Sequence, residues 1–292
     1  MTSPPAAATT APAEPWRLIR WRIRQLAYRE LLAPGVELIL MRIPAGSFLM
    51  GSAEEEEGSR ANERPLHRVQ VGEFLMGRTP VTQAQWRAVA EWEPKEGEKP
   101  WGMQLDPDPS RFKGANRPVE KVRWAQAREF CRPLRQRTGK NYHLPSEAQW
   151  EYACRADTTT PFHFGATLTT ALANYNSIYS YGDGPKGAYR QKTVEVASFP
   201  GNAWGLHDMH GNVWEWCADH WHDTYNGAPA DGSPWINDKS NDVRRRLLRG
   251  GSWDYDPGAC RSAYRLSDHP DYRLSDVGFR VCCLPQDLLL YT

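Results

Sequence analysis

The sequence has no long apolar run, no excess of one charge and no evident internal repeat. No stretch approaches the about 18 apolar residues of a membrane-spanning helix, so we expect no span. Lysine and arginine (36) balance aspartate and glutamate (35), which argues against a nucleic-acid-binding protein with a broad basic face. The 292 residues suffice for a substantial core, and the 23 glycines and 23 prolines predict a loop-rich fold.

The sequence also lacks a C-x-x-C pair and a secretory signal. Its first fifteen residues contain neither a basic n-region nor an apolar h-region. We therefore expect a reducing, cytoplasmic location with buried free thiols, and a few disulfides are the alternative that the spacing leaves open. The six cysteines are Cys131, Cys154, Cys217, Cys260, Cys282 and Cys283.

Composition divides the chain into three parts. Residues 1–15 are rich in proline, alanine and threonine and predict a disordered tail. Residues 16–35 form a basic arm whose apolar residues fit a helical stripe, although Trp21 and Ile23 between arginines also fit a strand. Such an arm can contact a membrane surface or a partner, but packing on its own domain is the favoured interpretation. Residues 36–285 are expected to form one domain.

Strand patterns occur early and late in that domain. Residues 36–52 predict two short strands around a turn, and residues 67–77 predict a third strand with Val69 and Val71 on one side. After Arg155 no helix is expected, and the remainder is interpreted as short strands and long loops. Helices followed by irregular strands indicate an α+β fold with low regular content.

Three helices are predicted between these regions. The first begins at Thr82, and Gln85 three residues later completes a capping-box pattern. The second spans residues 124–138. The third begins at Ser146, with Gln149 at the matching capping-box position.

Residues 207–223, HDMHGNVWEWCADHWHD, contain the densest group of candidate metal ligands. Zinc is disfavoured because the histidines lack helix-face spacing and no C-x-x-C accompanies them. Asp208 and Glu215, with Gly211 and Asn212 between them, better suit a hard cation such as calcium.

Seven motifs, in the same order, resemble those of the formylglycine-generating enzyme, or sulfatase-modifying factor, family. The resemblance covers about residues 36–283 and implies an α+β variant of the C-type lectin fold, with short helices and a small twisted antiparallel sheet. The motifs are IPAGSFLMGS (43–52), TPVTQAQW (79–86), RPVEKVRWAQAREFC (117–131), LPSEAQWEYACRA (144–156), NAWGLHDMHGNVWEW (202–216), LRGGSW (248–253) and VGFRVCC (277–283).

The resemblance carries two expectations about metals. The family's oxidases hold copper(I) between two cysteines five positions apart, and here Tyr255 replaces the first while Cys260 matches the second. We therefore expect neither copper nor oxidase activity. The family's structural calcium loop is implied at the side chains of Asp208 and Glu215 and the backbone carbonyls of Gly211 and Val213.

Residues 249–281 resemble the variable region of proteins diversified by retroelements. Mutagenised codons in such regions cannot encode Lys, Glu, Gln, Met or Trp. None of these types occurs at the fifteen positions that lie between the expected framework residues: 254–256, 258, 259, 264, 266–269, 272 and 274–277. Within a variable region of about 254–277, the expected ligand-binding residues are Asp254, Tyr255, Asp256, Gly258, Ala259, Tyr264, Leu266, Ser267, Asp268, His269, Tyr272, Leu274, Ser275 and Asp276. Arg261, Arg265 and Arg273 are expected to pair with carboxylates or carbonyls beneath this surface.

The sequence therefore predicts a non-catalytic binding protein. Tyr255, Tyr264 and Tyr272 are the expected anchors, and a protein is the favoured ligand because tyrosine-rich surfaces suit macromolecular contact. The alternatives are a copper-dependent oxidase that uses Cys260, a regulatory module of fixed specificity, and an ordinary polar surface without a ligand.

Overall fold

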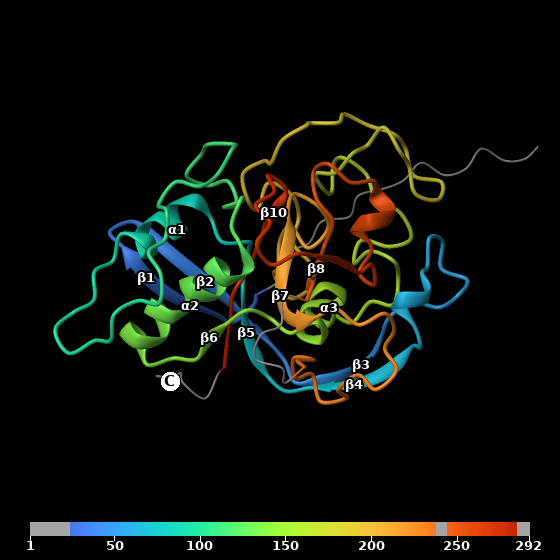
Figure 1. Ribbon diagram of the computed structural model, residues 1–292. Helices are drawn as coiled ribbons and strands as arrows, with labels where there is room; N and C mark the ends of the chain where they lie inside the picture. Colours follow the sequence, from blue (N-terminus) through green and yellow to red (C-terminus); the bar gives the residue numbers. More distant parts are fainter. Residues whose placement is uncertain (1–23, 238–243, 285–292) are drawn as a thin grey trace, which may run out of the picture.

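A computed structural model describes residues 24–237 and 244–284 (Figure 1). The predicted tail and residues 16–23 of the arm lie outside the described residues. The described chain folds into three antiparallel or mixed sheets, three α-helices and long connecting loops.

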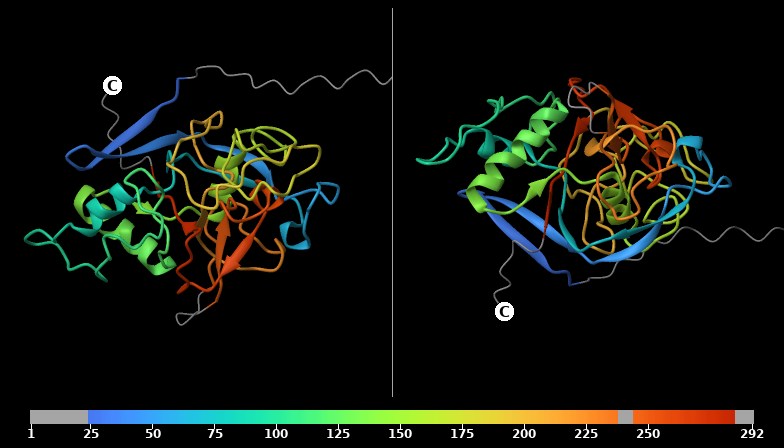
Figure 2. Two further views of the ribbon diagram at one scale, coloured as in Figure 1. Left: turned by 90° about the horizontal axis from the view of Figure 1, so that it is seen from above. Right: turned by 60° about the horizontal axis from the view of Figure 1, so that its bottom comes forward.

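The largest sheet has five antiparallel strands in the order β1-β2-β5-β11-β6. The helices α1 (Gln83–Ala90) and α2 (Trp124–Thr138) contact it, and the β1–β2 hairpin lies at one edge of the molecule (Figure 2). The strands are β1 (Ala27–Ala33), β2 (Val36–Ile43), β5 (Phe74–Gly77), β6 (Tyr142–His143) and β11 (Cys282–Cys283).

The second sheet has the order β10-β7-β8-β9, and β10 runs parallel to β7. Helix α3 (Glu147–Arg155) packs between this sheet and the two-stranded sheet β3-β4. The remaining elements are β3 (Gly46–Met50), β4 (His67–Val71), β7 (Trp214–His220), β8 (Arg246–Arg249), β9 (Leu266–Asp268), β10 (Val277–Gly278) and the 3-10 turns η1 (Ala61–Glu63) and η2 (Pro257–Cys260).

The helices begin where local capping signals predicted. The Thr82 hydroxyl accepts a hydrogen bond from the Gln85 N–H at 3.2 Å, and the Gln85 side chain accepts one from the Thr82 N–H at 2.9 Å. Ser146 and Gln149 form the same capping box at α3. None of the helices within the described ranges is long and apolar enough to cross a membrane.

One predicted strand is divided between two sheets. The expected strand over 67–77 is two strands: β4 pairs with β3, whereas β5 joins the five-stranded sheet. The strand after the turn at Pro44 therefore pairs with β4 rather than with β2. Within the arm, β1 is a strand paired with β2, so this part packs on its own domain.

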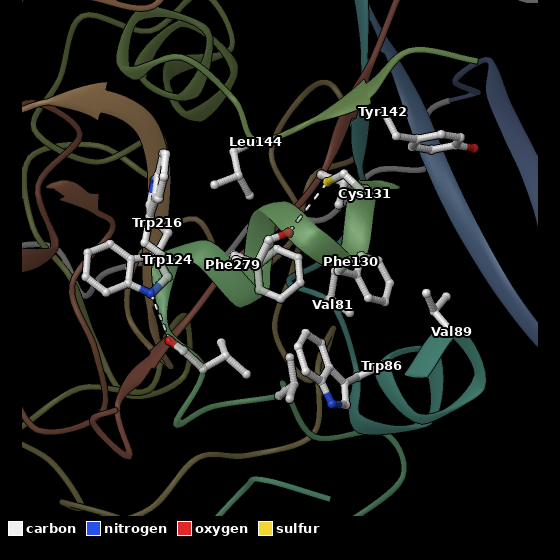
Figure 3. Close-up of a cluster of buried hydrophobic side chains, with 14 of the residues drawn as sticks. Val81, Trp86, Val89, Trp124, Phe130, Cys131, Tyr142, Leu144, Trp216 and Phe279 are labelled. Atoms are coloured by element: carbon white, nitrogen blue, oxygen red, sulfur yellow. Dashed lines mark hydrogen bonds between the residues drawn. The ribbon is translucent and has the colours of Figure 1, made fainter. Parts of the chain in front are cut away.

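Aromatic rings fill the core between α1, α2 and the carboxy-terminal strands (Figure 3). Trp86 stacks on Phe130 with centroids 5.7 Å apart, and Phe279 meets both rings edge-on. Trp214 and Trp216 on β7 are fully buried, as expected of core residues. This core supports the loops that follow β8.

Candidate ligand-binding face

The motif R-G-G-S-W forms a turn after β8 that only glycine tolerates at its centre. Gly250 and Gly251 have φ angles of 100° and 75°. A Cβ on Gly251 would lie 2.4 Å from the Sγ and 2.9 Å from the Cα of Cys260. The turn therefore packs directly on η2.

Buried arginines hold the loops on either side of η2 in place. Arg261 donates to both carboxylate oxygens of Glu63, at 2.7 and 2.9 Å, and to the Gly58 carbonyl at 2.6 Å. Arg265 donates to both oxygens of Glu147, at 2.6 and 2.9 Å. These two arginines are buried and form the expected frame. Arg273 is exposed, so the prediction that it belongs to this frame is wrong.

The residues before and after these two arginines in the sequence reach the surface in two groups. Asp254, Tyr255 and Asp256 precede η2 and are exposed; Tyr272 and Leu274 are 53% and 40% exposed. Six further expected positions are partly exposed: Gly258, Leu266, Asp268, His269, Ser275 and Asp276. We call the exposed and partly exposed residues of 254–276 the variable face, after the resemblance to a variable region from which they were predicted.

Three expected contact residues do not reach the surface. Ala259, Tyr264 and Ser267 are 1%, 5% and 7% exposed. The Tyr264 ring lies 5.8 Å from the Trp214 ring, and the Arg60 guanidinium covers it at 4.4 Å. Tyr264 is therefore a packing residue and not an anchor.

Tyr255 joins the two groups of the variable face. Its ring meets the buried Trp214 ring edge-on at 5.1 Å. Burial raises the pKa of Tyr255, and the carboxylates of Asp276, Asp268 and Asp254 raise it further. The Ser252 carbonyl accepts from the Tyr255 N–H at 3.3 Å and the Ser252 hydroxyl donates to Asp276 at 3.1 Å, so the segments before and after η2 meet near Tyr255.

Three aromatic residues that the sequence did not single out as site residues border this face. The Trp253 indole N–H donates to the Ser275 carbonyl at 3.1 Å, and the Phe112 ring meets Trp253 edge-on at 5.4 Å. Tyr189 stacks on Trp253 and hydrogen-bonds to Asp254. No local pattern could place Phe112 or Tyr189 here, because they come from loops 65 or more positions away in the chain.

Glu120 holds the Phe112 loop against this border. One oxygen of its fully buried carboxyl accepts from the Phe112 N–H at 2.8 Å, while the other has no hydrogen-bond partner. Burial raises the pKa of Glu120 from 4.5 to about 7. The folded protein therefore keeps a proton that the unfolded chain releases above pH 4.5.

We expect Glu120→Gln to become progressively more stable than the parent protein as the pH rises from 4.5 to 7. The parent loses stability over this window because its unfolded state binds fewer protons, whereas glutamine does not titrate. The expected difference between pH 4 and pH 8 is up to about 3 kcal/mol, measured by urea unfolding. Parallel pH profiles for the two proteins would contradict this assignment.

Cys260 lies beneath the variable face and not on it. Its side chain is fully buried against Tyr175, Tyr181 and Phe162, and its Sγ lies 3.8 Å from the Asp256 carbonyl oxygen. Burial raises the pKa of the Cys260 thiol, which disfavours the reactive thiolate. All six cysteines are free and buried.

The predicted calcium residues lie close together but are engaged with other groups. Both oxygens of Glu215 accept hydrogen bonds from Arg280 at 2.6 Å, and the Trp150 indole N–H donates to Glu215 at 2.8 Å. Asp208 accepts from Ala197 N–H through one oxygen only. Calcium bound at Glu215 would have to displace a buried arginine, so these residues do not fit the ion as they are arranged here.

No group of three or more histidine, cysteine, aspartate or glutamate side chains within residues 24–237 and 244–284 is placed to hold a metal ion. His210 gives one reason, because both of its ring nitrogens are hydrogen-bonded to backbone groups. Its Nδ1 donates to the Cys260 carbonyl at 2.7 Å, and its Nε2 accepts from the His163 N–H at 3.0 Å. Burial lowers the pKa of His210 to about 4, so its neutral ring serves as a structural bridge.

Comparison with known proteins shows which family this chain matches. A family model described as the sulfatase-modifying factor enzyme 1-like domain matches residues 37–283. The formylglycine-generating enzyme of Mus musculus is 29% identical over 314 residues, covering 86% of this chain and 79% of that protein. Two solved structures cover 90% of this chain and 100% of their own: PvdO from Pseudomonas aeruginosa (32% identity, TM-score 0.73) and Treponema denticola variable protein 1 (26%, 0.66).

The similar proteins therefore include a formylglycine-generating enzyme, matched by sequence, and a variable protein, matched by structure. The α+β, C-type-lectin-like fold expected from the motifs is confirmed, with two main sheets instead of one. The chain belongs to the sulfatase-modifying factor enzyme 1-like domain family.

Proposed function

We propose that this protein binds a ligand through the variable face and leaves the ligand chemically unchanged. The favoured ligand is another protein. The observation that carries the proposal is the contrast between frame and surface. Arg261 and Arg265 are buried in ion pairs, whereas Tyr255 before them and Tyr272 and Leu274 after them are exposed. A surface built in this way can change its side chains without loss of the fold.

The composition of the variable face supports recognition. Aspartate is the most frequent residue of this face, and Tyr255 and Tyr272 lie among the aspartates. In antibody paratopes tyrosine supplies rigid contact area, and small polar residues supply adaptable hydrogen bonds. The similarity to Treponema denticola variable protein 1 supports the same interpretation. We further propose that a retroelement diversifies these positions. A reverse-transcriptase gene and a near-copy template repeat beside the gene are the expected genomic signs, and the absence of both would remove this part.

The alternative is an oxidase of the formylglycine-generating type that uses Cys260, and the similarity to the Mus musculus enzyme favours testing it. Two observations speak against it. Tyr255 supplies a phenol where the copper site needs a second thiolate, and the Cys260 thiol is buried with a raised pKa.

One paired experiment separates the two functions. A display library randomised at five exposed face positions, sorted with biotinylated lysozyme as the probe, is expected to yield folded binders. A control library of the same size, at five exposed positions remote in sequence, is expected to yield far fewer. The face positions are Asp254, Tyr255, Asp256, Tyr272 and Leu274, and the control positions are Arg87, Glu91, Lys95, Glu96 and Lys99.

In parallel, the parent protein with copper(I) and a cysteine-containing peptide is expected to show no oxidation above that of Cys260→Ser. Equal yields from both libraries would contradict the binding proposal. Turnover that disappears in Cys260→Ser would establish the oxidase instead.

A further inference from the structure

A groove lined by β3 and the loop that follows it extends to the border of the variable face, where the Tyr181 ring in its wall would lie 3.7 Å from a Cβ on Gly258. Two adjoining hollows of about 290 and 550 Å³ share Ala53, Glu56 and Thr159 in their walls. The first lies between β3 and the turn that follows α3, with Phe48, Leu49, Leu66, Tyr152 and Asp157 among its lining residues. The second continues past Glu55, Glu57 and Asp183.

The groove presents an unpaired strand edge and exposed apolar side chains. In the described part of the chain, β3 pairs with β4 alone, so its other edge has no strand beside it. Leu49 and Leu66 are 53% and 42% exposed on this side of the sheet. A free edge beside apolar side chains is the arrangement that accepts an added strand.

Acidic residues also line the groove, and Arg155, a basic residue in its wall, is buried in an ion pair with Glu151. Asp157 borders the apolar hollow, and Glu55, Glu57 and Asp183 border the second; all four side chains are exposed. The favoured occupant is therefore an extended peptide that alternates apolar and basic residues.

The chain itself carries such a sequence in its basic arm. Residues 19–24 read IRWRIR, which places Ile19, Trp21 and Ile23 on one side of an extended strand and three arginines on the other. Residues 16–24 contain four arginines, and the groove carries four exposed acidic residues. The sequence complements the groove in both polarity and charge.

The arm enters the fold next to the apolar end of the groove. The Gln25 amide donates to the Ala203 carbonyl at 2.6 Å, beside Trp204. The Trp204 ring lies 4.8 Å from Tyr152, and Tyr152 lies 5.3 Å from Phe48 in the groove wall. Nine extended residues span about 30 Å, so residues 16–24 reach along the groove from this point.

We propose that residues 16–24 dock in the β3 groove of their own chain as an added strand, with the apolar side chains on the face of β3 that carries Leu49 and the arginines toward the acidic rim. The docked arm covers Leu49 and Leu66 and satisfies the free edge of β3. This inference is independent of the ligand proposed for the variable face.

Trypsin cleavage within the arm of the full-length protein tests the proposal. Cleavage after Arg20 and Arg22, followed by mass spectrometry, is expected to be about tenfold slower than in a synthetic peptide of residues 14–26, because a docked strand must open before it is cut. A triple variant of the rim, Glu55→Gln, Glu57→Gln and Asp183→Asn, is expected to lose most of this protection.

The control variant makes the same change in charge elsewhere, at Glu91→Gln, Glu93→Gln and Glu96→Gln, and is expected to keep the protection. Thermal unfolding of both variants checks that they fold. Cleavage as fast as in the free peptide would overturn the proposal. Protection that rises with protein concentration would place the arm in the groove of a second copy and would also overturn docking within one chain.

Discussion

Arg265→Met is expected to lower the free energy of unfolding by about 3–5 kcal/mol, because removing one partner leaves a buried charge uncompensated. Arg265 supplies two hydrogen bonds to Glu147 and further bonds to the carbonyls of Asn62 and His222, at 2.5 and 3.0 Å. Arg249 remains near Glu147 at 3.7 Å but is already bonded to Glu151. The substitution therefore removes the contact that joins the loop after η2 to α3.

Arg273→Met is the matched control, since it makes the same chemical change in the same arginine series. Arg273 is exposed, so its replacement is expected to change the free energy of unfolding by no more than about 0.5 kcal/mol. Urea unfolding at pH 7 measures both variants. Similar losses in the two would show that the frame does not depend on the buried ion pairs.

Gly251→Ala is expected to destabilise the protein by about 2–4 kcal/mol. A left-handed residue other than glycine costs about 1 kcal/mol, and overpacking adds about 1–3 kcal/mol. The added Cβ would meet the Sγ of Cys260 at 2.4 Å and the Ala259 carbonyl oxygen at 3.0 Å. Both the turn and η2 beneath it have to shift.

Two further variants separate the causes. Gly35→Ala has the same φ of 75° with no atom within 4 Å of the new Cβ, so it is expected to lose only the conformational part, about 1 kcal/mol. Combining Gly251→Ala with Cys260→Ala removes the Sγ contact and is expected to show a coupling energy that offsets part of the loss. Equal losses in Gly35→Ala and Gly251→Ala would contradict the close packing of this turn on η2.

Local signals predicted the helices well. Thr82 with Gln85, and Ser146 with Gln149, form capping boxes within four residues. These hydrogen bonds need no contact with distant parts of the chain. Strand pairing could not be predicted from local sequence. The segment 67–77 has one alternating pattern, but its first half joins one sheet and its second half joins another. The alternation of a strand shows which side chains are buried and does not show which strand pairs with it.

The variable face shows the same limit at its tyrosines. Tyr255, Tyr264 and Tyr272 carry the same side chain in one segment, yet Tyr264 is 5% exposed and Tyr272 53%. Trp214 and Arg60 cover Tyr264, and both come from distant parts of the chain. Exposure at a given position therefore depends on neighbours that the segment itself does not contain.

By itself, the sequence determined the family and the helix boundaries, because family motifs and helix caps consist of short contiguous segments. Through the resemblance it also led to the expectation that Tyr255 stands where the family's oxidases have a copper-binding cysteine. Only the tertiary structure decided that Arg261 pairs with Glu63, 198 positions away, and that Glu215 is bound to Arg280 instead of being free for calcium. A buried charged side chain is stable only when it is paired, and the packing of the whole domain decides which residue lies close enough to pair with it.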